Sequence, residues 1–140
     1  PAGPQPVAVA MSPDGRTALV ADFQASAVTP IVLSSMTASP GIAVNGNATG
    51  IAVQPRTQTA YVSDGDALTP IDLTTLQAKP PLQVGVGATA VALAPSGSVA
   101  WVCANDGTVV PVNVVTGRRG KPVRVGGQPS AIAIPPVARS

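Results

Sequence analysis

The sequence contains no histidine and no glutamate, and aspartate supplies all six of its acidic residues. Without histidine, no Ser–His or Cys–His catalytic pair can form. The side chain best suited to proton transfer near neutral pH is also missing. We therefore do not expect an enzyme whose catalytic groups all lie within this chain.

Charge and aromatic side chains are scarce as well. Charged residues make up 10% of the chain, the net charge is +2, and the aromatic residues are Phe23, Tyr61 and Trp101 alone. Nucleic-acid-binding surfaces combine clustered cations with aromatic side chains that stack on bases. The one dense basic stretch, at 118–121, is interpreted as a solvated turn. We expect no nucleic-acid partner.

Cysteine occurs once, at Cys103, so no intramolecular disulfide and no paired-cysteine metal site can form. It lies in an apolar segment, which predicts a buried side chain. No apolar run approaches the roughly 18 residues of a membrane span. The sequence opens Pro-Ala-Gly-Pro without Met, and we expect no signal peptide in it. It is poor in Lys and rich in Ala, Val, Pro and Arg. This composition suits an exported bacterial protein, so we expect an extracellular or cell-surface location.

What the sequence does contain is a repeat of about 41 residues. Four similar segments end in prolines that are 42, 40 and 41 residues apart; they are Val7–Pro13, Gly50–Pro55, Ala90–Pro95 and Ala131–Pro136. Three further sets of similar segments recur at the same period between them. These sets begin at Thr17, Thr59 and Val99, at Val28, Leu68 and Val109, and at Gly41, Pro81 and Pro122.

Each segment is short, rich in Val, Ile and Thr, and bounded by Pro, Gly, Asn or Asp, which is typical of a strand between turns. Four strands per repeat of about 40 residues predict the blade of a β-propeller. The expected fold is all-β, with three four-stranded blades at 6–46, 47–87 and 88–128. An extra strand at 129–136 would begin a further blade, so the ring is incomplete on its own.

The side chains agree with propeller geometry. Alanine alternates with branched residues in each first strand, as expected where neighbouring blades converge on the axis. Larger residues at one position of the second strand, Leu19, Tyr61 and Trp101, should be buried in the widening gap between blades. A proline recurs in each third strand, where a β-bulge is the simplest prediction.

These segments resemble the YVTN-type β-propeller repeat of bacterial surface and exported proteins, over nearly the whole chain. The resemblance implies the fold, whereas the family includes surface-layer proteins, lactonase-like enzymes and lyases. The chain differs from the family pattern at Asp22, Asp64 and Ala104, where an Asn commonly closes the second strand.

Loops after the second strands and between blades carry the candidate site. The ligand-binding candidates are Asp22, Asp64, Asn105 and Asp106, and neighbouring polar residues are Gln24, Asn45, Asn47 and Asp66. Converging carboxylates could hold Ca²⁺. The same residues are also ordinary turn formers, and that interpretation is favoured. We therefore assign no metal, no cofactor and no catalytic residue.

Two functions remain open. The favoured one is a non-catalytic binding or structural module that contacts protein or cell-wall partners through its loops. The alternative is a fragment of a lactonase-like hydrolase or lyase with a metal, held by Asp22 and Asp64, in the channel mouth. An open arc of three blades would leave two apolar faces in water. Missing blades of a longer propeller or a second copy of the chain could cover them; an unrelated β architecture is the third possibility.

Overall fold

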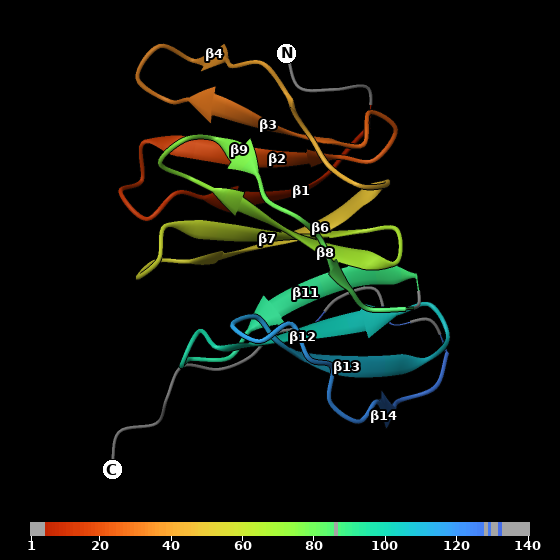
Figure 1. Ribbon diagram of the computed structural model, residues 1–140. Coiled ribbons are helices and arrows are strands. Elements are labelled where there is room, and N and C mark those ends of the chain that lie inside the picture. The colour runs from red at the N-terminus through yellow and green to blue at the C-terminus, as the bar shows by residue number, and fades with distance from the viewer. Residues whose placement is uncertain (1–4, 86, 128, 130–131, 133–140) are drawn as a thin grey trace.

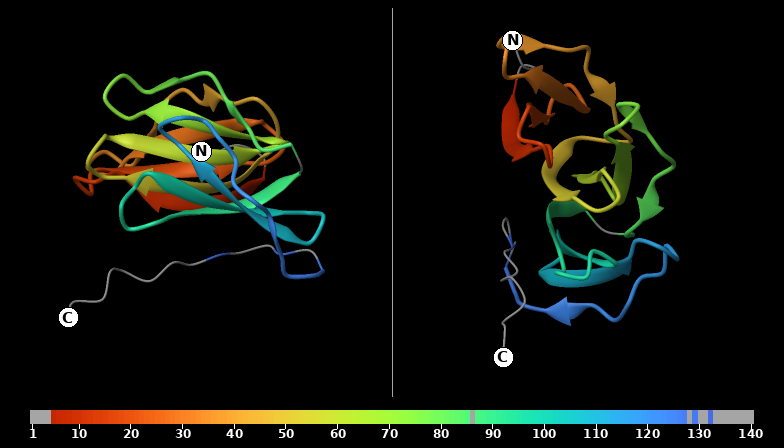
Figure 2. Two further views of the ribbon diagram at one scale, coloured as in Figure 1. Left: turned by 60° about the horizontal axis from the view of Figure 1, so that its bottom comes forward. Right: turned by 90° about the vertical axis from the view of Figure 1, so that its left-hand side faces the viewer.

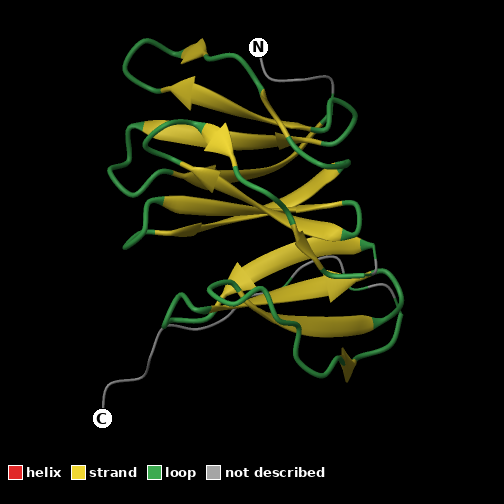
Figure 3. Cartoon of the chain, viewed as in Figure 1, coloured by secondary structure: helices red, strands yellow, loops and turns green. Residues whose placement is uncertain are grey.

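The computed structural model describes residues 5–85, 87–127, 129 and 132, and within them every regular element is a β-strand (Figure 3). The all-β prediction is confirmed. Sheet 1 contains β1 (Pro6–Met11), β2 (Thr17–Asp22), β3 (Ala27–Val32), β4 (Thr37–Ala38) and β5 (Ile42–Ala43). Sheet 2 contains β6 (Ala48–Gln54), β7 (Thr59–Asp64), β8 (Ala67–Asp72), β9 (Gln77–Ala78) and β10 (Leu82–Gln83). Sheet 3 contains β11 (Ala88–Leu93), β12 (Val99–Ala104), β13 (Thr108–Asn113) and β14 (Val123–Arg124).

All strand pairs are antiparallel, and the first three strands of each sheet pair in chain order. In sheets 1 and 2 the outer strand is split in two, so that β4 and β5 both pair with β3, and β9 and β10 both pair with β8. The turn between β1 and β2 shows how the sequence reverses the chain between two paired strands. Gly15 adopts a φ of 72°, and its N–H donates to the carbonyl of Ser12. Asp14 Oδ1 accepts from the main-chain N–H of Arg16 at 3.0 Å. A Pro-Asp-Gly sequence supplies both the fixed and the positive φ that such a turn needs.

The third-strand prolines form no bulge against the second strand, where the pairing is unbroken. The predicted irregularity lies on their other side in sheets 1 and 2, where the pairing with the outer strand shifts by one residue beside Pro30 and beside Pro70. Pro30 lies in unbroken register opposite Leu19, and its carbonyl accepts from the N–H of Ser39. The nitrogen of Pro30 therefore faces the outer strand, which is interrupted at this point between β4 and β5. Pro70 and Pro111 accept in the same way from Lys79 and Gly120. The missing N–H of proline does not weaken the sheet at a point where the neighbouring strand is already interrupted.

The three sheets stack face to face in chain order (Figures 1 and 2). Leu19 and Val28 of sheet 1 pack against Val62 and Ile71 of sheet 2 in one buried cluster. A second cluster joins sheet 2 to sheet 3 and includes Leu68. The core of the molecule therefore lies between sheets, and each sheet needs a neighbour to bury its face.

First strands approach closely where the sheets converge. A Cβ added to Gly50 of β6 would lie 3.2 Å from Ala90 Cα of β11 and 2.9 Å from Ser63 Oγ. Such distances leave no room for a side chain. Glycine and alanine in the first strands thus allow the sheets to come together on this side.

Trp101 is only half-buried, which corrects the prediction that it fills an inter-sheet gap. Its counterparts Leu19 and Tyr61 are buried because a following sheet covers each of them. No such sheet follows sheet 3 in the described residues. The prediction of burial is wrong because no described sheet covers Trp101.

Cys103 is 1% exposed, which confirms its predicted burial, and this burial raises the pKa of its thiol. The predicted extra strand at 129–136 lies almost wholly outside the described residues. No helix in the described part of the chain is long and apolar enough to cross a membrane.

Candidate functional site

Loops of the three sheets meet along one edge of the molecule, on the right in Figure 1. We call this edge the loop rim. It consists of the loops that follow the second strand of each sheet and the connections between sheets, namely residues 23–26, 45–47, 65–66, 85, 87 and 105–107. Its exposed side chains include Phe23, Gln24, Asn47, Asp66 and Asn105. These side chains expose amide groups, a carboxylate and an aromatic ring to solvent.

Hydrogen bonds join one loop of the rim to the next. Asn47 Nδ2 donates to the carbonyl of Phe23 at 2.8 Å, and the carbonyl of Asn47 accepts from the N–H of Gly65 at 3.3 Å. Between sheets 2 and 3, the N–H of Asn105 donates to the carbonyl of Gly87 at 2.8 Å. The rim is therefore a connected surface whose loops support one another.

Asp64 lies beneath this rim and is fully buried. Its carboxylate accepts from Thr69 Oγ1 at 2.8 Å, and from the main-chain N–H groups of Asn45 and Gly46 at 2.6 and 3.3 Å. Desolvation raises the pKa of Asp64 to about 6, although these hydrogen bonds lower it. The carboxylate ties the connection that leaves sheet 1 to the edge of sheet 2.

Asp22 occupies the same place in sheet 1 and is also fully buried. Its Oδ2 accepts from Thr29 Oγ1 at 2.7 Å, as Asp64 accepts from Thr69. Among the described residues, Asp22 Oδ1 is a buried side-chain atom with no hydrogen-bond partner. Neither aspartate faces a partner in solvent, so the structure does not bring them together with Asn105 and Asp106 as one exposed group.

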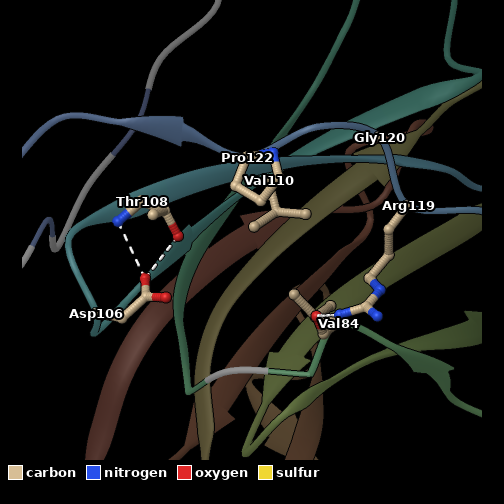
Figure 4. Close-up of a pocket in the computed structure, with 7 residues that line it drawn as sticks. All are labelled: Val84, Asp106, Thr108, Val110, Arg119, Gly120 and Pro122. Atoms are coloured by element: carbon tan, nitrogen blue, oxygen red, sulfur yellow. Dashed lines mark hydrogen bonds between the residues drawn. The ribbon is translucent and has the colours of Figure 1, made fainter.

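Asn105 and Asp106 are both exposed on the rim. Asp106 Oδ1 accepts from the N–H of Thr108 at 3.1 Å and from its hydroxyl (Figure 4). This is the local bonding of a turn residue, and it leaves the side chain open to solvent. Of the four candidates, these two can contact a partner directly.

A shallow pocket of about 260 Å³ lies beside Asp106, between the end of sheet 2 and the outer strands of sheet 3 (Figure 4). Val84, Val110 and Pro122 form its apolar wall. Arg119 lines it too, and its Nη1 donates to the carbonyl of Val84. Asp106 Oδ1 and Arg119 Nη1 are thus both engaged within the protein.

The sequence interpretation missed two features. Arg119, taken as part of a solvated turn, links sheet 3 to sheet 2. The other is the Asp–Thr pair, for which a signal existed: Asp22 with Thr29 and Asp64 with Thr69 give way together to Ala104 and Val110 in the third repeat. Joint replacement of a carboxylate and a hydroxyl by two apolar residues indicates that they contact each other.

Within the described residues, no group of three or more His, Cys, Asp or Glu side chains could hold a metal ion. The arrangement of the rim is suited to recognition through hydrogen bonds and apolar contact. It offers no general acid paired with a base, and no nucleophile next to one.

No protein-family model matches the chain, and no curated protein matches it in sequence. Among solved structures, it resembles a chain of hydrazine synthase from Kuenenia stuttgartiensis, with a TM-score of 0.82 and 20% identity. The match covers 91% of this chain and 38% of that one, so the chain spans well under half the length of its structural neighbour. In all, 743 chains of solved structures match, and an architecture this widespread indicates the fold without selecting a function.

Proposed function

We propose that this chain is a segment of a β-propeller of the YVTN-repeat type, in which each sheet is one blade. It acts as a non-catalytic binding or structural module at the surface or exterior of a bacterium, and it contacts its partners through the loop rim. The observation that carries this proposal is the connected rim itself. Loops from three sheets form one polar surface, and buried bonds hold it in place.

The chemistry of the chain supports a binding role over a catalytic one. The sequence has no histidine or glutamate. The two buried aspartates bond to threonine hydroxyls and, for Asp64, to main-chain N–H groups. Their bonds are those of structural carboxylates. Asn105 and Asp106 remain the candidates for ligand contact, together with Phe23 and Asp66 on the other loops of the rim.

The test uses co-sedimentation of the chain with purified bacterial cell envelopes. A variant with Phe23→Ala, Asp66→Ala and Asp106→Ala should lose at least about tenfold in affinity, because aromatic and charged contacts dominate such surfaces. The matched control changes three exposed residues at the opposite edge, Met36→Ala, Leu76→Ala and Val115→Ala. It should bind as the unchanged chain does. Equal loss in both variants, or no binding by the unchanged chain, would contradict the proposal.

Thermal melting with calcium separates this proposal from the hydrolase or lyase alternative. A specific metal site raises the midpoint as calcium increases, by mass action. The binding module predicts the same midpoint with and without calcium. A rise that Asp22→Asn or Asp64→Asn abolishes would support the metal-dependent alternative.

A further inference from the structure

The pocket beside Asp106 carries opposite charges at its two ends. Figure 4 shows the carboxylate of Asp106 at one end and the guanidinium of Arg119 at the other, while Val84, Val110 and Pro122 form the apolar wall. At neutral pH a carboxylate is negative and a guanidinium is positive. A ligand that bonds to both ends would therefore carry one positive and one negative group, joined by an apolar body.

Both charged side chains retain hydrogen-bonding capacity for such a ligand. Asp106 uses Oδ1 for the N–H and the hydroxyl of Thr108, and among the described residues its Oδ2 has no hydrogen-bond partner. A guanidinium has several N–H donors. Arg119 donates from Nη1 to the carbonyl of Val84, and its other N–H groups bond to no acceptor in the part of the chain that the structure describes. Both side chains are exposed, so a ligand can reach the free atoms.

The guanidinium lies at this boundary because two positions of the repeat are changed. Arg119 forms a bridge with Val112, and Ala78 takes the same place in sheet 2. A Cβ added to Gly85 would collide with Arg119 Nη1, and in the preceding repeat this position is Asn45. Sheets 1 and 2 stack with Ala78 and Asn45 at these positions, so stacking alone does not require the arginine.

The carboxylate also departs from the preceding repeat. The loop between β12 and β13 covers residues 105–107, whereas the loop between β7 and β8 covers residues 65–66. The longer loop carries Asp106 to the edge of the pocket. Val110 lines the pocket where sheet 2 has Thr69, whose hydroxyl is bonded to a buried carboxylate. The wall between the two charges is thus apolar at a position where the repeat elsewhere has a hydroxyl.

We propose that this pocket binds a dipeptide with a free amino group and a free carboxyl group. The ammonium group donates to Asp106 Oδ2, the carboxylate accepts from Arg119, and the apolar side chains contact Val84 and Val110. In a free amino acid both charged groups are attached to one carbon, whereas the peptide unit of a dipeptide separates them, as charges at opposite ends of a pocket require.

The size of the pocket agrees with such a ligand. Its volume of about 260 Å³ lies just below the range of roughly 300–1,000 Å³ that is typical of sites for drug-sized molecules. The inference rests on the proposed function, because Asp106 belongs to the loop rim, and it names a class of ligand that the rim binds.

Isothermal titration calorimetry of the full chain with the dipeptide alanylleucine tests the proposal. The unchanged chain should bind alanylleucine. N-acetyl-alanylleucine and alanylleucine amide should each bind at least about fivefold more weakly, because each lacks one charged group and its charge-assisted hydrogen bond.

Two variants assign each end of the ligand to its side chain. Asp106→Asn should weaken the binding of alanylleucine at least about fivefold and leave that of N-acetyl-alanylleucine unchanged, because the ammonium group is already absent from the acetylated probe. Arg119→Gln should weaken the binding of alanylleucine by a similar factor and leave that of alanylleucine amide unchanged. These pairings separate direct contact with the ligand from a general loss of structure.

Two further variants are matched controls and should bind alanylleucine as the unchanged chain does. Asp14→Asn changes an exposed carboxylate with similar turn bonding, since Asp14 Oδ1 accepts from the N–H of Arg16 and from the hydroxyl of Ser12. Arg118→Gln changes the exposed arginine that precedes Arg119 and does not line this pocket.

The outcomes separate this inference from the proposed function. No binding of alanylleucine by the unchanged chain, or an equal loss in the pocket variants and the controls, would overturn the inference. Asp106→Asn keeps an acceptor for Thr108, so it tests the pocket even where circular dichroism shows that Arg119→Gln does not fold. Envelope binding through the rim without alanylleucine binding would overturn this ligand alone. Alanylleucine binding without envelope binding would support the pocket and contradict the proposed function.

Discussion

Leu68→Ala is expected to lower the free energy of unfolding by about 2–5 kcal/mol, which is the range for a fully buried large-to-small change. Leu68 is 0% exposed and belongs to the cluster between sheets 2 and 3. The substitution removes apolar contacts and leaves a cavity that rigid neighbouring strands cannot readily fill. The loss should accordingly be large for a chain of this size.

Urea unfolding followed by the fluorescence of Trp101, the single tryptophan, measures this effect. The control is Val115→Ala, at a position 79% exposed, and it should change the free energy by no more than about 0.5 kcal/mol. If the two substitutions cost the same, the core does not lie between the sheets and the stacking described above is wrong.

Asp64→Ala should destabilise the chain by about 2–4 kcal/mol near pH 4, because it leaves the hydroxyl of Thr69 and the N–H groups of Asn45 and Gly46 without their acceptor. The control is Asp66→Ala, an exposed carboxylate two residues away, with an expected cost within about 0.5 kcal/mol. Urea unfolding measures both variants. Equal costs would mean that Asp64 does not anchor the connection between sheets 1 and 2.

The effect of Asp64 should also depend on pH in a defined direction. Its pKa is about 6 in the folded chain and near the ordinary aspartate value of 3.8 in the unfolded chain, so the folded state holds the proton more tightly. The stability that Asp64 contributes is thus fully present below pH 3.8 and falls as the pH rises through about 6. The total fall is on the order of 2–3 kcal/mol. The difference between the unchanged chain and Asp64→Asn should shrink from pH 4 to pH 7; a difference that grows would contradict this direction.

Local features could be predicted from the sequence because they depend on local chemistry. The turn at Pro13–Arg16 follows from the φ values that Pro and Gly allow, and the burial of Cys103 follows from the apolar strand around it. Features that depend on a neighbouring sheet could not be predicted in this way. Trp101 has the sequence context of Tyr61, but only Tyr61 has another sheet over it.

The candidate site shows the same limit. Asp22 and Asp64 close their strands in sequence and resemble exposed loop carboxylates, yet both are buried and bonded to threonine. Their role depends on which connection crosses above them, and this is set by how consecutive sheets are placed. At Pro30 the sequence indicated an irregularity but not its side: the shift in pairing lies against the outer strand and not against the second strand.

Co-sedimentation with purified cell envelopes tests most directly whether the loop rim is a binding surface. The account predicts that the chain with Phe23→Ala, Asp66→Ala and Asp106→Ala binds at least about tenfold more weakly than the unchanged chain. The chain with Met36→Ala, Leu76→Ala and Val115→Ala, at the opposite edge, should bind as tightly as the unchanged chain. Equal binding by the two variants would contradict the account.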